Sequence, residues 1–229
     1  MTAADYFSNV PLFQCLPLED RRHLFASTRR EHLKKGDVLF RKGSEGTALY
    51  VIHQGKIKVS ATSPGGDEVI LAVFTDGDYF GEMSLLDGMP RSADATAIEP
   101  SELFALNQSD FNAFLQQHPA AVSAILKALS QRLRKTDDLL EDTCFLNISS
   151  RFAKKLVELA ERNGHFTHHT IRIGTGFSQR DLAGMIGASR ESINKELRVL
   201  KEKGMVTIAD NTVYIHDLDR LKKRIRPFR

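Results

Sequence analysis

Residues 80–97 read FGEMSLLDGMPRSADATA and hold a glycine, a carboxylate and a guanidinium within one short stretch. Gly81 has no Cβ, so another group can approach its backbone closely. Glu82 follows with a carboxylate, and Met83 begins a segment long enough for one short helical turn. The N-terminus of such a turn offers unpaired N–H groups to an anion.

The second half of the stretch brings two more polar groups to the same place. Residues 87–90, DGMP, predict a tight turn that returns Arg91 and Ser92 toward Glu82. One carboxylate, one helix N-terminus and one arginine suit a ligand with a sugar hydroxyl and a single phosphate charge. Taken as separate residues, a surface turn with a chance arginine is an equally good interpretation.

As one string, the stretch resembles the phosphate-binding cassette of cyclic-nucleotide-binding domains, whose pattern is roughly F-G-E-x-[AS]-L followed by P-R-[AST]-A. Residues 80–85 and 90–93 match this pattern. The resemblance implies that Glu82 holds the ribose 2′-hydroxyl and that Arg91 pairs with the cyclic phosphate, which Ser92 also contacts. It places Gly81 and Met83 in the same site.

Composition limits the class of protein. The 229 residues allow one large or two small domains, and 41% are hydrophobic, enough for a buried core. No apolar run approaches the roughly 18 residues of a membrane helix, and no secretory signal is visible. Cys15 and Cys144 are too few for a disulfide framework or an iron–sulfur cluster. We therefore expect a cytoplasmic protein with no membrane partner and no metal.

Charge is unevenly distributed along the chain. Residues 147–229 hold 17 Lys/Arg and 9 Asp/Glu, a net charge of +8, and residues 1–146 hold the remaining 15 and 20, a net charge of −5. This asymmetry favours a polyanionic partner for the C-terminal third alone. Solvated surface charge explains the basicity by itself equally well.

The N-terminal half predicts a mainly β domain. Residues 5–30 have the pattern of short helices, and residues 32–106 that of short strands separated by glycine-containing turns. Such a pattern predicts a barrel or sandwich, and the turns are also typical of the cyclic-nucleotide-binding β-barrel. The clearest expected strands are 38–40, 48–52, 55–60 and 68–74.

A long helix is expected from about residue 119 to about residue 142. Its apolar positions are spaced 4, 3, 4, 3 and 4 residues apart, which is a heptad seam suited to pairing with another helix. We expect a homodimer through this helix. Ile125 widens the apolar stripe and favours the alternative, a helix packed on its own barrel. The seam consists of Val122, Leu126, Leu129, Leu133, Thr136 and Leu140.

The polar seam position Thr136 can set the register of helix pairing or contact a ligand. The family resemblance implies that this helix closes over the base and that Thr136 bonds the purine. Asp137 stands where Ser or Asn is common in that family. An ionised carboxylate only accepts hydrogen bonds, so Asp137 could accept from the adenine amino group or from the N–H groups of guanine. We expect cAMP rather than cGMP, and Arg132 as a second phosphate-side contact.

Residues 145–151 are the expected hinge, and a second helix should run from about 150 to 162. This division predicts an α+β chain of three parts. They are a β-barrel domain over 1–118, the dimerisation helix and hinge over 119–146, and a winged helix-turn-helix DNA-binding domain over 147–229.

Residues 178–203 have the pattern of two short helices joined by a tight turn, which predicts a helix-turn-helix. Residues 178–181, SQRD, form a capping-box pattern, and Gly187 allows the sharp turn before Ser189 caps a second helix over about 190–203. Ile193, Leu197 and Leu200 should face inward, with the polar and basic residues outside. Residues 205–215 predict a hairpin, the wing. An ordinary helical hairpin is the alternative, which the local charge disfavours.

Both halves together resemble the Crp/Fnr family of bacterial transcription regulators, in the family's order. Residues 187–195, GASRESINK, match its recognition-helix pattern G-x-S-R-E-[ST]-[VI]-x-[RK]. The resemblance implies RNA polymerase as a partner and a palindromic operator with TGTGA-like half-sites. Lys195 stands where Arg is common, which puts the base preference there in doubt. The implied DNA contacts are Ser178, Gln179, Ser189, Arg190, Glu191 and Lys195.

Physical chemistry supports two of these contacts. Arg190 can donate two bonds to guanine O6 and N7, and Glu191 can accept from cytosine N4. The alternative functions are the same regulator with cGMP, another effector or none, and, from another class, a regulatory subunit of a kinase. An enzyme is disfavoured because no Walker loop, HExxH or GxSxG motif occurs. His168 and His169 in an expected loop are better explained as solvated than as metal ligands.

Overall fold

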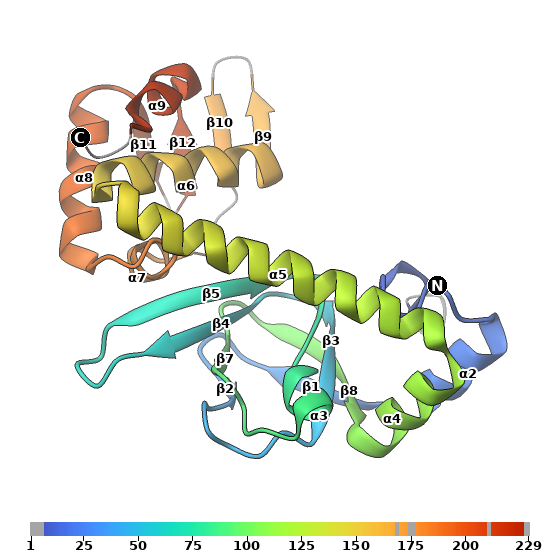
Figure 1. Cartoon of the computed structure of the whole chain (residues 1–229). Coiled ribbons are helices and arrows are strands. Elements are labelled where there is room, and N and C mark those ends of the chain that lie inside the picture. Colours follow the sequence, from blue (N-terminus) through green and yellow to red (C-terminus); the bar gives the residue numbers. More distant parts are fainter. Residues whose placement is uncertain (1–6, 168–169, 174–176, 210–211, 227–229) are drawn as a thin grey trace. The chain divides into compact units, whose positions relative to one another are not determined.

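The computed structural model describes residues 7–167, 170–173, 177–209 and 212–226. The chain divides into two compact units (Figure 1). Unit 1 consists of Met1–Ala61 and Leu71–Arg134, and unit 2 of Thr62–Ile70 and Lys135–Arg229. The predicted residue ranges of the three parts stay a prediction.

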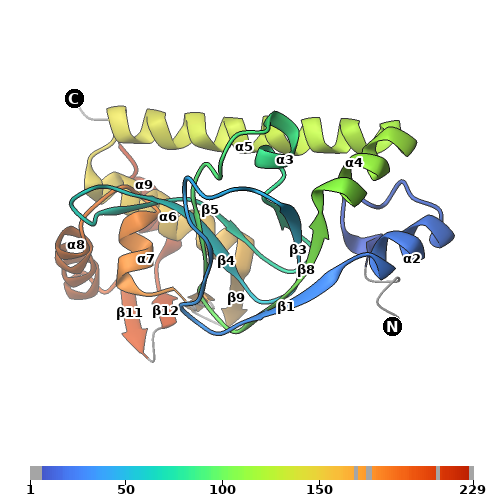
Figure 2. The same ribbon diagram turned by 90° about the horizontal axis from the view of Figure 1, so that it is seen from below.

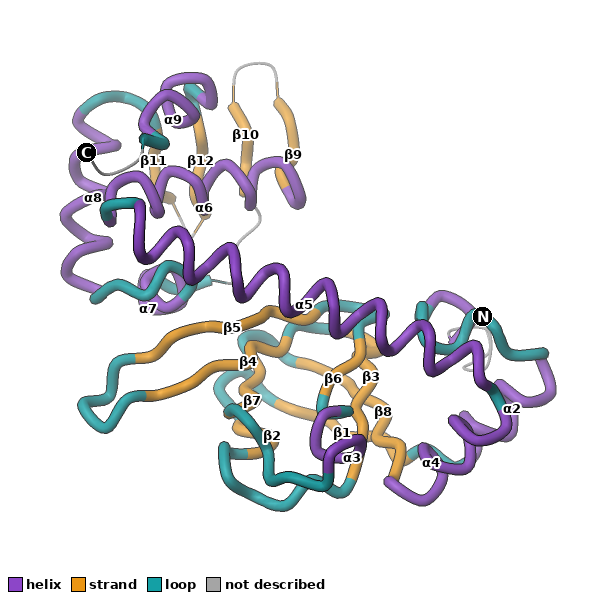
Figure 3. The backbone as a smooth tube through the Cα atoms, viewed as in Figure 1, coloured by secondary structure: helices purple, strands orange, loops and turns teal. Residues whose placement is uncertain are grey.

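Two four-stranded sheets build the N-terminal β domain (Figure 3). This is the double-sheet form of an antiparallel all-β architecture, so the expected β domain is present as two sheets and not as one closed barrel. One sheet has the order β1 (Arg29–Leu33), β8 (Ser101–Asn107), β3 (Ala48–Gln54), β6 (Tyr79–Phe80), and the other has the order β2 (Val38–Phe40), β7 (Asp94–Ala97), β4 (Ile57–Thr62), β5 (Glu68–Phe74).

Helices close one end of the β domain. The 3-10 helix η1 (Phe7–Asn9) and helix α2 (Leu18–Ala26) confirm the expected short N-terminal helices, although β1 begins before residue 30. Helix α4 (Gln108–Gln117) was not expected from the sequence; Figure 2 shows it beside α2 and the first turns of the long helix. The aromatic rings of Phe7 and Phe13 stack at 4.7 Å in the buried core there.

The long helix α5 spans Pro119–Phe145, three residues beyond its expected end. Helix α6 (Ile148–Asn163) begins after a break of only Leu146 and Asn147, so the expected seven-residue hinge is much shorter. Asn147 explains the sharp restart, because its side-chain oxygen accepts from the Ser150 backbone N–H at 2.9 Å as an N-cap.

Two faces of α5 have different surroundings. Ile125 is 3% exposed and packs in the core of the β domain, with Leu129 partly buried against that core. The remaining apolar seam positions are open to solvent: Val122, Leu126, Leu133 and Leu140 are 39%, 60%, 63% and 64% exposed. The helix therefore packs on its own β domain with one face and leaves an apolar stripe uncovered.

The C-terminal part of unit 2 is a winged helix-turn-helix, as expected (Figure 1). Strands β9 and β10 and helix α9 were not expected from the sequence. The expected loop residues 168–169 and wing-tip residues 210–211 lie outside the described residues. After α6 the elements are β9 (Gly164–Thr167), β10 (Thr170–Ile173), α7 (Gln179–Gly184), α8 (Arg190–Glu202), β11 (Val206–Ala209), β12 (Thr212–Ile215) and α9 (Leu218–Arg224).

Candidate functional site

The cassette folds as a tight loop around the short helix α3 (Met83–Asp87). Gly81, at φ +85°, turns the chain out of β6, and Gly88, at φ +71°, ends α3 in the left-handed conformation. The Met89 N–H donates to the Asp87 side chain at 2.9 Å. The predicted turn is therefore present, and it returns the chain to Arg91.

Arg91 is a buried cation that backbone carbonyls hold in place. Its side chain donates to the carbonyl oxygens of Gly81 at 2.7 Å and Ala48 at 2.8 Å, and the residue is 4% exposed. The guanidinium carbon lies 4.3 Å from the centre of the Phe40 ring. Among the described residues, no carboxylate forms an ion pair with Arg91.

Burial lowers the pKa of the Arg91 guanidinium, and the nearby Tyr50 and Glu82 oppose that shift. A guanidinium nevertheless stays protonated in a folded protein. A buried charge is costly unless another charge compensates it. The structure thus fixes a positive charge at the position where the sequence predicts the phosphate.

Two glycines make room for this guanidinium. A Cβ built on Gly81 would lie 2.8 Å from Arg91 Nη1, and one on Gly46 would lie 2.3 Å from Ser84 Cβ and 3.3 Å from Arg91 Cζ. The sequence identified Gly81 as a close-approach position. It did not identify Gly46, because the glycine-rich segment 43–46 has the ordinary signature of a turn.

Glu82 is the second buried charge of the cassette, at 1% exposed. Its Oε1 pairs with the Arg132 guanidinium, which reaches it from α5 and also donates to the Tyr79 carbonyl. Its Oε2 is buried and has no hydrogen-bond partner among the described residues. This oxygen is therefore a ready acceptor for a ligand hydroxyl.

Arg132 lies on the carboxylate side of the cassette. The sequence-based prediction put it beside the phosphate, whereas here it pairs with Glu82 and lies 4.7 Å from the centre of the Phe74 ring. Next to it, burial raises the pKa of Tyr79 to about 12, against the opposing effect of Arg132. The phosphate contact of Arg132 stays a prediction.

The remaining predicted ligand contacts lie at the surface or in the other unit. Ser92 and Met83 are exposed, and the Ser92 hydroxyl lies 3.9 Å from the Met83 sulfur. Thr136 and Asp137 are exposed on the part of α5 that belongs to unit 2. Their contact with a base stays a prediction.

The predicted capping box at Ser178 and the predicted N-cap at Ser189 start the two helices of the helix-turn-helix. Ser178 and Asp181 exchange side-chain and backbone hydrogen bonds at the start of α7, including Ser178 Oγ to Asp181 Oδ2 at 2.7 Å. Ser189 caps α8 by accepting from the Ser192 N–H at 3.2 Å. Gln179 occupies the first position of α7 and is half-buried. Both serine hydroxyls therefore cap the N-termini of helices, and both are also candidates for DNA contact.

The outer face of α8 carries unpaired polar side chains. Arg190, Glu191 and Lys195 are exposed and form no hydrogen bond or ion pair through their side chains with any residue that the structure describes. The predicted inward residues of α8 are buried, which confirms the division into two faces; they are Ile193, Leu197 and Leu200. The outer face therefore offers both donors and acceptors to a partner.

Two negative findings apply to the described ranges. No helix there is long and apolar enough to cross a membrane. No group of three or more metal-binding side chains occurs within those ranges either.

Both halves of the chain resemble known protein families. The family pattern of the cyclic nucleotide-binding domain matches residues 30–118, and that of the Crp-like helix-turn-helix domain matches residues 150–224. The chain is 32% identical to a CRP-like cAMP-activated global transcriptional regulator of Mycobacterium tuberculosis, over 84% of this chain and 86% of that protein. It is 34% identical to the Cyclic AMP receptor protein of Thermus thermophilus, over 93% and 95% of the two chains.

A solved structure supports the fold. The c-di-GMP responsive global regulator CLP of Xanthomonas campestris superposes with a TM-score of 0.79 at 22% identity. The match covers 88% of this chain and 100% of that chain.

We predict that Gly81→Ala weakens binding of a cyclic nucleotide more than tenfold, because the added Cβ would displace the Arg91 guanidinium. Gly88→Ala is the matched control. Gly88 also has a positive φ, but nothing lies within 4 Å of a Cβ built on it. Calorimetric titration of the two variants checks this, and equal affinities would show that the Arg91 position is unimportant.

Proposed function

We propose that this chain, which belongs to the Crp/Fnr family of DNA-binding transcription regulators, is switched by a cyclic nucleotide and that cAMP is the preferred one. The family consists of regulators and not of enzymes. The observation that carries the proposal is the buried Arg91 guanidinium, which has no carboxylate partner among the described residues.

The two buried charges of the cassette define the ligand. An anionic phosphate beside Arg91 compensates a charge that is otherwise costly to bury. The free Oε2 of Glu82 accepts a hydroxyl but repels a second negative charge. A cyclic nucleotide offers both features, a singly charged phosphodiester and a ribose 2′-hydroxyl.

The names of two relatives support cAMP as the preferred nucleotide. The Mycobacterium tuberculosis and Thermus thermophilus relatives are named for cAMP, whereas the Xanthomonas campestris regulator is called c-di-GMP responsive. Effectors therefore differ between proteins of this fold. Asp137 accepts from the adenine amino group but also from guanine N–H groups, so cGMP, another effector or none are the alternatives.

Calorimetric titration with cAMP and with cGMP tests this proposal. We expect tighter binding of cAMP, and Arg91→Ala should remove a charge-assisted contact worth about 1.5–3 kcal/mol, roughly ten- to a hundredfold in affinity. Arg41→Ala, which removes the same charge from an exposed residue, is the control. Full-strength binding by the Arg91 variant, or no binding of either nucleotide by the native chain, would contradict the proposal.

Dimerisation through α5 is the second part of the proposal. The exposed apolar stripe of α5 repeats at heptad spacing, and pairing with a second copy would bury it. A two-fold dimer would place two recognition helices on a palindromic operator, with half-sites about 34–36 Å apart.

We predict that the double variant Leu126→Glu/Leu133→Glu is a monomer in sedimentation while the native chain is a dimer. Each glutamate would put an unpaired charge into the helix interface. The control is Leu18→Glu/Leu71→Glu, which changes two leucines that are also exposed but lie on α2 and β5. A native chain that is monomeric with nucleotide and DNA present would rule out the dimer.

The third part of the proposal is the operator. DNA binding follows from the family, and we infer TGTGA-like half-sites read by Arg190 and Glu191, with RNA polymerase as the partner at the promoter and the cytoplasm as the location. The free side chains on the outer face of α8 support this role. Lys195 donates as a point charge and lacks the planar fork of arginine.

Arg190→Ala should lower affinity for the operator by about 1–3 kcal/mol and relax the preference for one guanine. Arg172→Ala removes an exposed arginine of β10 and should keep that preference. Selection from random duplexes, followed by titration, measures both effects. Half-sites unrelated to TGTGA would show that the base preference inferred for α8 is wrong.

A further inference from the structure

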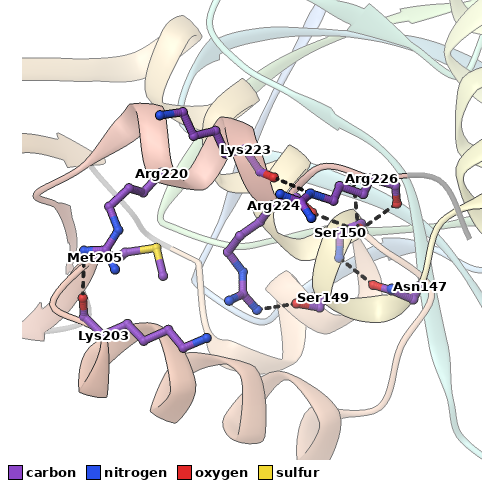
Figure 4. A pocket seen from close by; sticks show the side chains of 9 residues that line it. All are labelled: Asn147, Ser149, Ser150, Lys203, Met205, Arg220, Lys223, Arg224 and Arg226. Carbon is purple, nitrogen blue, oxygen red and sulfur yellow. Dashed lines mark hydrogen bonds between the residues drawn. The ribbon is translucent and has the colours of Figure 1, made fainter.

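A cavity of about 500 Å³ lies in unit 2 between the start of α6, the end of α8 and helix α9 (Figure 4). None of the described residues that line it is acidic, and five are cationic. These five are Lys203, Arg220, Lys223, Arg224 and Arg226.

Hydrogen bonds hold the walls of this cavity together. Ser150, at 2% exposed, lies with its hydroxyl 3.0 Å from the carbonyl oxygens of both Arg224 and Arg226. The Arg224 guanidinium contacts the Ser149 hydroxyl on α6 and Glu196 on α8, the latter at 3.2 Å. The cavity is therefore a preformed feature of three packed helices.

Positive charge at the cavity exceeds what carboxylates compensate. Arg224 pairs with Glu196, and Arg220 lies 3.8 Å from Asp217. The other three cations, Lys203, Lys223 and Arg226, form no ion pair with a residue in the described ranges. In Figure 4 the side chains of Lys203 and Arg224 extend toward the same space.

The remaining lining groups also suit an anion. α6 starts at the cavity, so the positive end of its dipole faces it, and Ser149 and Asn147 add a hydroxyl and an amide. A volume of about 500 Å³ lies within the roughly 300–1,000 Å³ range of small-molecule pockets. Guanidinium and ammonium groups together are typical of phosphate sites.

The cavity is distant from the groups that are expected to read DNA bases. Lys203 follows the last turn of α8, whereas Ser189 and Arg190 stand at its first. At about 1.5 Å per residue, the 13 residues of α8 separate its two ends by roughly 20 Å. A ligand in the cavity therefore leaves the base-reading end of α8 free.

We propose that this cavity binds a small phosphate-bearing anion with at least two negative charges, as a site distinct from the cyclic-nucleotide cassette. The volume of about 500 Å³, which is enough for a whole small molecule, favours a free anion over a phosphate of the DNA backbone. The site exists whether or not the cassette binds cAMP.

Calorimetric titration of the full chain with inorganic pyrophosphate, at fixed ionic strength and without nucleotide, tests the proposal. We expect saturable binding of one pyrophosphate per chain. Lys203→Gln/Lys223→Gln should weaken it more than tenfold. Lys201→Gln/Lys222→Gln, which removes the same charge from exposed residues of α8 and α9 outside the cavity, should change it less than twofold. No saturable binding, or equal losses in both variants, would overturn the proposal.

A duplex titration over a range of salt concentrations distinguishes the DNA backbone as the source of phosphate. We expect the same salt dependence of duplex affinity for the two double variants, because an anion site away from the duplex contributes no DNA phosphate contact. A log–log slope smaller by about 0.9 in the cavity variant alone would mean one lost DNA phosphate contact and would overturn the small-anion site.

Discussion

The positive charge of Arg91, buried between backbone carbonyls, is the constraint on which the ligand site depends. Its two carbonyl partners come from β3 and from the start of the cassette, so sheet and loop must both be in place before the guanidinium is held. The bare backbones of Gly46 and Gly81 are required for the same reason. A folded β domain thus carries a buried charge that no carboxylate of the described residues pairs with, and the proposed anionic ligand would compensate it.

Glu82 connects this site to the long helix. Its carboxylate accepts a hydrogen bond from Arg132, which stands on α5 between the apolar seam positions Leu129 and Leu133. A ligand hydroxyl at the second oxygen of Glu82 would share the carboxylate with Arg132. α5 continues without interruption to Phe145, and only two residues separate it from α6. A conformational change of α5 at the cassette would therefore reach the DNA-binding domain through a short stretch of chain. A ligand can shift the equilibrium between two conformations of α5 only if its affinity for them differs.

Much of this architecture was predictable because local chemistry and global fold agree. The cassette turn, the helix caps at Ser178 and Ser189, and the inward leucines of α8 follow from short-range rules. The missed elements depend on distant partners. Helix α9 is short and has a strongly basic last turn, so its local sequence gives only a weak helix signal. The Ser150 hydroxyl on α6, about seventy residues away, donates to the Arg224 carbonyl and helps to hold α9 in place. Likewise, Arg132 donates to Glu82, which lies fifty residues earlier in the chain. Sequence spacing did not indicate this ion pair.

In the proposed mechanism, the nucleotide and the operator both bind more tightly to the same state of the protein. By thermodynamic reciprocity, operator DNA must then tighten nucleotide binding by the same factor by which nucleotide tightens DNA binding. The direct measurement is the affinity for cAMP with and without a saturating operator duplex, at one fixed salt concentration because DNA affinity depends strongly on salt. We expect tighter cAMP binding in the presence of the duplex. Equal affinities, in a protein shown to bind both ligands, would contradict it.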